Sequence, residues 1–250
     1  MRFVSLVPSL TETLIDFGLG GSIVGRTRWC TEPADVVDGI EAVGGTKNPD
    51  VARIVALRPD LVVVNKEENR IEDCRAMQEA GLALHVTHPR SVAGAAVMLA
   101  ELSAACGAAA AGAALAERCR EALVAADARA ATASRSVKTF CPIWHRPWMT
   151  FRRETYIGDM LVRVGCANVF GDRPGPDFFE VTLEEILAAA PRLVILADEP
   201  YAFEGQHAGE LRAAGLTARF VQLDGKDLAW YGPRIPQALE RLSQAVHAAA

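Results

Sequence analysis

Two stretches of this chain are near copies of each other, 132 residues apart. Residues 53–64 read RIVALRPDLVVV and residues 185–196 read EILAAAPRLVIL, with Ile, Ala, Pro, Leu and Val at matching places. Each stretch reads as the last turn of a helix, a proline that ends it, and a buried apolar strand. A second similar pair, 4–9 and 138–143, lies at the nearly equal offset of 134. Two half-chains of one design predict two similar lobes.

Polar side chains follow both repeat strands. Residues 65–68 read NKEE after the first strand, and residues 198–199 read DE after the second. Ligands of open α/β sheets bind beyond the carboxyl ends of the strands. Two facing lobes therefore predict a ligand cleft between them.

Composition fits two soluble lobes. The 250 residues are half apolar, and their net charge of −5 argues against nucleic acid, whose binding proteins carry basic faces. The sequence has no uncharged apolar run of ~18 residues, so we expect no membrane insertion. We expect a monomer.

The start of the chain and its cysteines suggest a compartment. The first predicted strand, residues 3–7, leaves no space for a secretory signal before it. Six cysteines without paired spacing favour reduced thiols. We therefore expect a cytoplasmic protein. The alternative is that a signal has been removed and the protein is periplasmic or lipid-anchored.

Strands and helices alternate in both halves, which predicts parallel sheets covered by helices. The alanine-rich stretch after the first half is poor in helix breakers and predicts one long helix over 108–134. The expected fold class is α/β, with two Rossmann-like lobes joined by one long backbone helix. The expected divisions are an N-terminal lobe, 1–107, a connecting helix, 108–135, and a C-terminal lobe, 136–250. Strands are expected at 3–7, 22–25, 61–64, 84–87, 137–141, 193–196 and 219–223. Helices are expected from Ser9 or Thr11 to Gly18, and at 50–57, 70–80, 91–106, 156–164, 182–189, 206–214 and 233–248.

Catalytic motifs are missing from the sequence. The glycines at 18–21 follow a helix rather than a strand, which is typical of a turn and not of a dinucleotide site. The sequence has no GxSxG elbow, and its five histidines form no HExxH pattern. We predict a protein without enzymatic activity, resident metal or required cofactor.

Aromatic side chains gather in the predicted loops that follow strands. A flat, partly apolar ligand would suit several such rings, since each can bury ~150–250 Å². Polar side chains near the same strand ends could bind amide groups of the ligand. The aromatic candidates are Trp29, Trp144, Trp148, Tyr201 and Trp230, and the polar ones are Lys47, Asn65, Glu67 and Glu199.

The segments 4–13 (VSLVPSLTET), 53–62 (RIVALRPDLV) and 232–234 (GPR) resemble the helical-backbone, or class III, substrate-binding proteins of ABC importers. The resemblance covers essentially the whole chain and is greatest to the cobalamin-binding members. It implies two lobes joined by one long helix and non-catalytic binding of cobalamin or a related corrinoid. It also implies an ABC permease partner if the protein is exported.

Site residues follow from this resemblance position by position. Pro8 and Ser9 match a loop that touches the corrin ring, Trp29 matches an aromatic of the cleft, and Phe178 or Phe179 matches another. Asn65 stands where the cobalamin binders have tryptophan. Glu184 matches one acidic residue that docks the permease, and Glu72 lies one position from the other.

Two other functions stay open. A siderophore or haem binder shares the scaffold, and arginines clustered in the cleft would favour it. A cytoplasmic enzyme acting on a tetrapyrrole would use His145 and Glu67 as titrating groups. His145 is also a candidate axial ligand of the cobalt.

Overall fold

The computed structural model describes residues 1–132 and 136–249, and the chain divides into two compact units. Unit 1 comprises Met1–Pro89, Gly94–Arg118 and Tyr231–Pro233; unit 2 comprises Arg90–Ala93, Cys119–Trp230 and Arg234–Ala250. The predicted divisions, 1–107, 108–135 and 136–250, stay predictions. Positions 133–135 of the predicted connecting helix lie outside the described residues.

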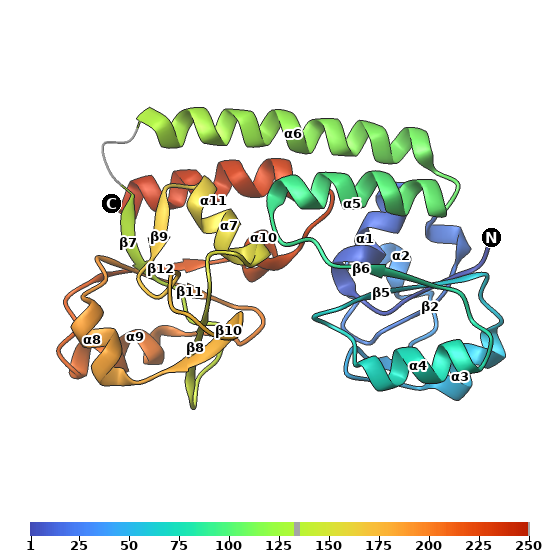
Figure 1. The fold of residues 1–250 in the computed structure, drawn as a ribbon, viewed down its shortest axis with the longest axis horizontal. Coiled ribbons are helices and arrows are strands. Elements are labelled where there is room, and N and C mark those ends of the chain that lie inside the picture. Colours follow the sequence, from blue (N-terminus) through green and yellow to red (C-terminus); the bar gives the residue numbers. More distant parts are fainter. Residues whose placement is uncertain (133–135, 250) are drawn as a thin grey trace. The chain divides into compact units, whose positions relative to one another are not determined.

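Unit 1 is built on a four-stranded, all-parallel sheet in the order β2-β1-β5-β6. Its helices α3 and α4 lie on one side of the sheet, and α1 and α5 lie on the other (Figure 1). The elements are β1 Phe3–Ser5, α1 Pro8–Asp16, a 3-10 turn Gly20–Ser22, β2 Ile23–Arg26, α2 Ala34–Val37, β3 Gly44–Gly45, β4 Asn48–Pro49, α3 Val51–Leu57, β5 Leu61–Asn65, α4 Ile71–Glu79, β6 Leu84–Thr87 and α5 Val92–Ala105.

Unit 2 repeats this plan with a parallel sheet in the order β12-β11-β7-β9 and a separate antiparallel pair, β10-β8. Helices α8 and α9 lie on one side of the larger sheet, and α7 and α11 lie on the other (Figure 1). The elements are β7 Val137–Phe140, β8 Trp148–Phe151, α7 Tyr156–Arg163, β9 Cys166–Asn168, β10 Phe178–Val181, α8 Leu183–Ala189, β11 Leu193–Ala197, α9 Gly205–Ala213, β12 Arg219–Leu223, α10 Gly225–Ala229 and α11 Ile235–Ala249.

The helix α6, Ala109–Thr132, connects the two units in the sequence. It is continuous over its 24 residues, as its alanine-rich composition predicts. The predicted fold class, two lobes with parallel sheets linked by one long helix, is confirmed.

The sequence repeat corresponds to a structural repeat of α3–β5 and α8–β11. The residue before each helix, Asp50 or Thr182, accepts a hydrogen bond from a backbone N–H in the first helical turn. Each helix ends on a left-handed residue, Arg58 with φ 47° or Ala190 with φ 46°. Both strands are then buried between helices. The shared proline therefore follows the same helix ending in both units.

Several local predictions are wrong. Helix α1 begins at Pro8 after Val7, and not after Ser9 or Thr11, because the fixed φ of proline suits the first helical position. Thr11 instead donates its hydroxyl to Ser5 Oγ and to the Val7 carbonyl. The elements β8, β9, β10 and α10 were not predicted. They are short, and they carry no long apolar run.

Trp148 and Trp230 also differ from the expectation of exposed loop aromatics. Trp148 is the first residue of β8, and its side chain belongs to the core of unit 2, with 7% exposure. Trp230 follows α10 and is equally buried. Trp29 and Trp144, in contrast, are 60% and 45% exposed.

All six cysteines are free, and every one except the half-buried Cys74 is buried. Burial raises the pKa of the Cys106 and Cys166 thiols to about 11. These thiols therefore stay protonated near neutral pH and act as small apolar side chains.

Two helix glycines give a matched test of the packing. A Cβ on Gly158, in α7, would approach the Arg153 Cα to 2.7 Å, whereas a Cβ on Gly209, in α9, would have no neighbour within 4 Å. We expect Gly158→Ala to lower the free energy of unfolding by about 1–3 kcal/mol through overpacking. Gly209→Ala should raise it by up to about 1 kcal/mol, because alanine favours helix. Urea denaturation would measure both, and equal effects would contradict the close packing of α7.

Candidate functional site

The strand order places a candidate binding edge in unit 1. The chain passes from β1 to β2 on one side and later to β5 on the other, so the direction of winding reverses between β1 and β5. Crevices at such reversals are where open α/β sheets bind ligands. Of the predicted residues, Pro8 and Ser9 follow β1, Asn65 is the last residue of β5, and Glu67 follows it. The structure therefore brings these four to one edge of the sheet.

Asn65 lies beneath this edge. It is 2% exposed, its Nδ2 donates to the Thr87 carbonyl and hydroxyl, and its Oδ1 accepts from the backbone of Glu67 and Glu68. Its hydrogen-bonding positions are thus used inside the protein. Asn65 shapes the turn after β5, which differs from the predicted direct contact with a ligand.

Asn69 extends this support to two other segments. Its Oδ1 accepts from the backbone N–H of Asn65, and its Nδ2 donates to the carbonyls of Leu6 and Thr46. Asn69 thereby joins the end of β1, the end of β5 and the glycine-rich loop. Asn69 was not predicted, although it is polar and comes four residues after Asn65.

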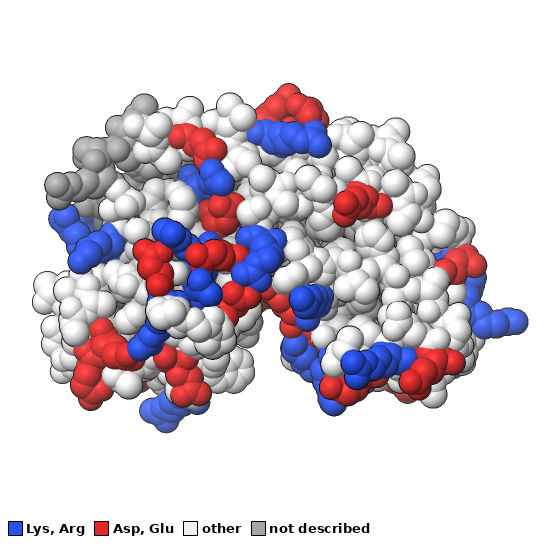
Figure 2. Space-filling view, viewed as in Figure 1, with Lys and Arg blue, Asp and Glu red and all other residues white. Residues whose placement is uncertain are grey.

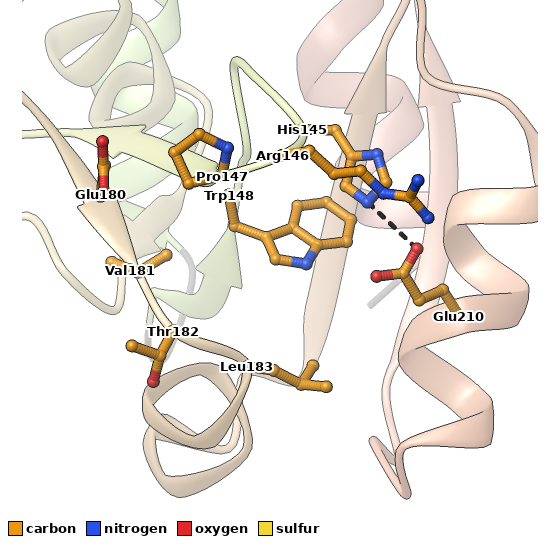
Figure 3. A pocket seen from close by; sticks show the side chains of 9 residues that line it. All are labelled: His145, Arg146, Pro147, Trp148, Glu180, Val181, Thr182, Leu183 and Glu210. Atoms are coloured by element: carbon orange, nitrogen blue, oxygen red, sulfur yellow. Dashed lines mark hydrogen bonds and ion pairs between the residues drawn. The ribbon is translucent and has the colours of Figure 1, made fainter.

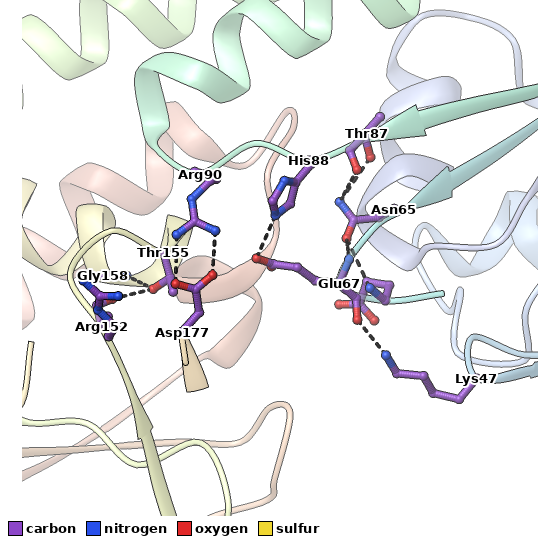
Figure 4. Close-up of polar contacts among 11 residues, drawn as sticks. Lys47, Asn65, Glu67, Thr87, His88, Arg90, Arg152, Thr155, Gly158 and Asp177 are labelled. Atoms are coloured by element: carbon purple, nitrogen blue, oxygen red, sulfur yellow. Dashed lines mark hydrogen bonds and ion pairs between the residues drawn. The ribbon is translucent and has the colours of Figure 1, made fainter. Parts of the chain in front are cut away.

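Glu67 is the centre of the exposed part of the edge. Its Oε1 lies 3.2 Å from His88 Nε2, and its backbone carbonyl accepts from Lys47 Nζ at 2.6 Å. Figure 4 shows the His88 ring directed at the Glu67 carboxylate. His88 was not predicted. It directly follows β6, however, and the expectation that ligands bind beyond the carboxyl ends of strands would have identified it. Glu67, Lys47 and His88 together form a polar, partly exposed group.

Four other residues complete the edge of unit 1. The exposed Trp29 has its indole nitrogen beside Gly45, in the loop that carries Lys47. Pro8 is half-buried and Ser9 is buried. Tyr231, which belongs to unit 1, is buried, and this burial raises the pKa of its hydroxyl above the usual range.

Unit 2 presents an aromatic edge at the equivalent strand ends. Trp144 follows β7 and meets Tyr201, which follows β11, edge to face at 5.3 Å between ring centroids. Tyr201 in turn contacts Phe203 at 4.8 Å. Trp144 and Tyr201, two of the aromatic candidates, therefore lie together, and their contact with a ligand stays a prediction.

Two histidines lie behind these rings. His145 and His207 pack at 4.8 Å between centroids, and His207 Nε2 lies 3.3 Å from the Tyr201 hydroxyl. His145 Nε2 lies 3.0 Å from Glu210 Oε2, and the His145 side chain is 7% exposed. Its role as an axial cobalt ligand stays a prediction. No group of three or more potential metal-binding side chains occurs among residues 1–132 and 136–249.

Glu199, which is half-buried after β11, pairs with Trp230, which is buried after α10. The Trp230 indole N–H donates to Glu199 Oε2 at 2.9 Å, and Lys226 and Arg234 lie over the indole ring. Burial raises the pKa of the Glu199 carboxyl. Phe178 is half-buried on β10, while the alternative Phe179 is buried beneath the Arg173 guanidinium.

The two candidate docking acids lie in first helical turns, Glu72 in α4 and Glu184 in α8. Backbone hydrogen bonds lower the pKa of both carboxyls. Acids are favoured at this position of a helix in any case. Their docking role stays a prediction.

Acidic and basic side chains are mixed on the viewed face of each unit (Figure 2), with no broad basic area there. In the described part of the chain, no helix has both the length and the apolarity needed to cross a membrane.

Comparison with known proteins decides the family. A profile of the periplasmic binding protein family matches residues 4–214. The chain belongs to this family. The resemblance to substrate-binding proteins is thereby confirmed, and a non-enzymatic, solute-binding role is the coarse function.

Two curated relatives cover nearly the whole chain. The vitamin B12-binding protein of Vibrio cholerae serotype O1 is 22% identical over 97% of this chain and 87% of its own. The uncharacterized ABC transporter substrate-binding lipoprotein YvrC of Bacillus subtilis is 25% identical over 98% of this chain and 80% of its own.

Two solved structures share this fold with similar TM-scores. The apo periplasmic heme-binding protein RhuT of Roseiflexus sp. RS-1 has a TM-score of 0.84, 23% identity, and coverage of 99% of this chain and 98% of its own. The periplasmic vitamin B12 binding protein BtuF of Vibrio cholerae has a TM-score of 0.83 and 18% identity, with coverage of 99% and 97%. These similarities support the fold. They do not decide between haem and vitamin B12 as the ligand of this chain.

The prediction of a cytoplasmic location is wrong. The family is one of periplasmic binding proteins, and the matched relatives are periplasmic proteins or a lipoprotein. A signal peptide is removed from a mature protein, so the position of the first strand at residue 3 gives no information about the compartment. Buried cysteines pack as apolar side chains, so their number does not report it either.

The half-buried Glu199 predicts a dependence of stability on pH. Its folded-state pKa is raised above the unfolded value, so protonation favours the folded state and the ionised form is penalised near neutral pH. Glu199→Gln keeps an acceptor for Trp230 and should raise the free energy of unfolding at pH 7. The gain should disappear as the pH falls below about 4, where glutamate is protonated in both states. Chemical denaturation at pH 7 and at low pH would measure it, and a pH-independent difference would contradict the assigned cause.

Proposed function

We propose that this protein binds cobalamin or a related corrinoid as the receptor of an ABC importer, outside the cytoplasm. The observation that carries the proposal is the pairing of exposed aromatics with polar groups at equivalent strand ends. Trp144 and Tyr201 offer ring surface in unit 2. Trp29, with Glu67 and Lys47, offers ring surface and polar contacts in unit 1.

The chemistry of these side chains suits a corrinoid. A corrin is broad and flat and carries neutral amide arms, which exposed rings and hydrogen-bond acceptors can contact. Two acceptors stand at the strand ends, Glu67 and Glu199. The full-length similarity to vitamin B12-binding proteins supports the same ligand class.

Haem is the second candidate, because several structures with this fold are heme-binding proteins. Haem differs from a corrinoid in carrying carboxylate groups. Glu67 and Glu199 would repel them, since like charges destabilise each other at short range. The same repulsion applies to anionic siderophores. The side chains at the strand ends therefore favour the corrinoid.

The partners of the proposed receptor follow from the same role. The permease would dock on acidic helix starts, for which Glu72 and Glu184 are the candidates. The protein would hold one ligand per chain and would need no cofactor of its own.

Titration calorimetry with cobinamide, cyanocobalamin and haemin tests the proposal. We expect one corrinoid per chain, and we expect Trp144→Ala to weaken binding by about 1–3 kcal/mol, the usual range for an aromatic anchor. Trp144 is preferred to the buried Trp148 because its removal leaves the core intact. Val124→Ala, an exposed apolar position on α6, is the control and should leave the affinity unchanged. Binding heat with haemin only, or no binding heat with any of the three compounds, would reject the corrinoid assignment.

A further inference from the structure

Unit 2 contains a cavity of about 390 Å³ between the turn before β8, the end of β10, the start of α8, and α9 (Figure 3). Its volume corresponds to roughly a dozen water molecules at the density of the liquid. The walls from Pro147, Val181 and Leu183 are apolar. The space suits a small organic group rather than a single ion.

The Trp148 side chain forms one wall and presents a hydrogen-bond donor. Its ring is stacked on Phe203 at 5.9 Å between centroids, with an interplanar angle of 4°, and meets His145 at 4.5 Å. The residue is 7% exposed, so the indole is fixed. The indole N–H faces the cavity in Figure 3, and the residues that the structure describes supply no hydrogen-bond acceptor for it. Indole nitrogen only donates, so it calls for an acceptor atom.

Glu210 supplies the complementary acceptor across the cavity. One carboxylate oxygen lies 3.0 Å from His145 Nε2, which holds the side chain in place. Figure 3 shows the other oxygen directed into the cavity. An ionised carboxylate only accepts hydrogen bonds, so this oxygen calls for an N–H or O–H group.

A fixed donor and a fixed acceptor facing one apolar space define a chemical class. We propose that this cavity is a subsite for a neutral amide group, whose carbonyl oxygen accepts from Trp148 Nε1 and whose N–H donates to Glu210. A primary amide or a lactam carries both functions on adjacent atoms. The amide can belong to a free small molecule or to an arm of a larger ligand. The proposal does not depend on the corrinoid assignment.

Charged ligands fit less well. The cavity is lined by two carboxylates, Glu180 and Glu210, and by one guanidinium, Arg146, so its charge disfavours a carboxylate ligand. An ammonium group would face the indole N–H, where the edge of the ring is positive. A neutral group with both hydrogen-bonding functions avoids both conflicts.

Nuclear magnetic resonance tests the site on the intact chain. The four tryptophans give four indole N–H resonances, and Trp148→Phe identifies that of Trp148 by its loss. Titration of the unmodified protein with benzamide should shift this resonance progressively. Benzoate and benzylamine, of nearly equal size, should shift it little. No shift with benzamide, or equal shifts with all three compounds, would overturn the proposal.

Affinity of the variants gives a second readout. Trp148→Phe keeps a ring but removes the N–H, and should weaken benzamide binding about three- to tenfold, as expected for one hydrogen bond. Val124→Ala is the control, because Val124 is exposed on α6 and does not line the cavity, and it should bind benzamide as the unmodified protein does. Equal weakening by both substitutions would contradict the assigned contact. If Trp148→Phe fails to fold, the variants Trp29→Phe, Trp144→Phe and Trp230→Phe assign the other three resonances and leave that of Trp148, whose shift with benzamide on the unmodified protein then decides the matter.

Cobinamide distinguishes the two sources of the amide. A shift of the Trp148 resonance with both cobinamide and benzamide supports the site as one that holds an amide arm of a corrinoid. A shift with benzamide alone supports it as a site for a free amide. Calorimetry measures separately whether the protein binds a corrinoid at all. Failure of this subsite and failure of the corrinoid assignment can therefore be told apart.

Discussion

Burial of parallel strands is the constraint on which the rest of this structure depends. In β5 and β11 the central residues are covered on both faces by helices and are almost without exposure. Such strands are continuously apolar, so polar side chains can appear only where the strands end. Both sheets reverse their winding beside these strands, and the polar and aromatic groups gather there in each unit. The binding edges thus follow from the way the sheets are buried.

The sequence repeat made the helix and parallel strand of each unit predictable, because the proline, the apolar strand and the polar residues after the strand recur together in both halves. It gave no information on β8 and β10, which lie outside the repeated segments and pair with each other. Trp148 was expected on a loop for that reason, and it lies in the core. Asn65 was expected to touch the ligand, yet its amide is used to shape the turn. Whether a polar side chain is available to a ligand or is used inside the protein depends on neighbours from other strands, such as Thr87. A sequence pattern does not reveal these neighbours.

Family membership and ligand identity rest on different kinds of residue. The buried framework is shared among proteins described as vitamin B12-binding and heme-binding, which explains why both match this chain at similar TM-scores. Under the proposed function, ligand choice depends on a few exposed groups, the Trp144–Tyr201 pair and the Glu67 group. These can change without disturbing the sheets. For the same reason the fold carries no information on the compartment, where the sequence expectation failed.

Native mass spectrometry of the protein isolated from its own host tests the central claim most directly, because it weighs whatever ligand the protein retains. The account predicts a complex heavier than the bare chain by the mass of one corrinoid. A complex carrying the mass of haem or of a siderophore would contradict it.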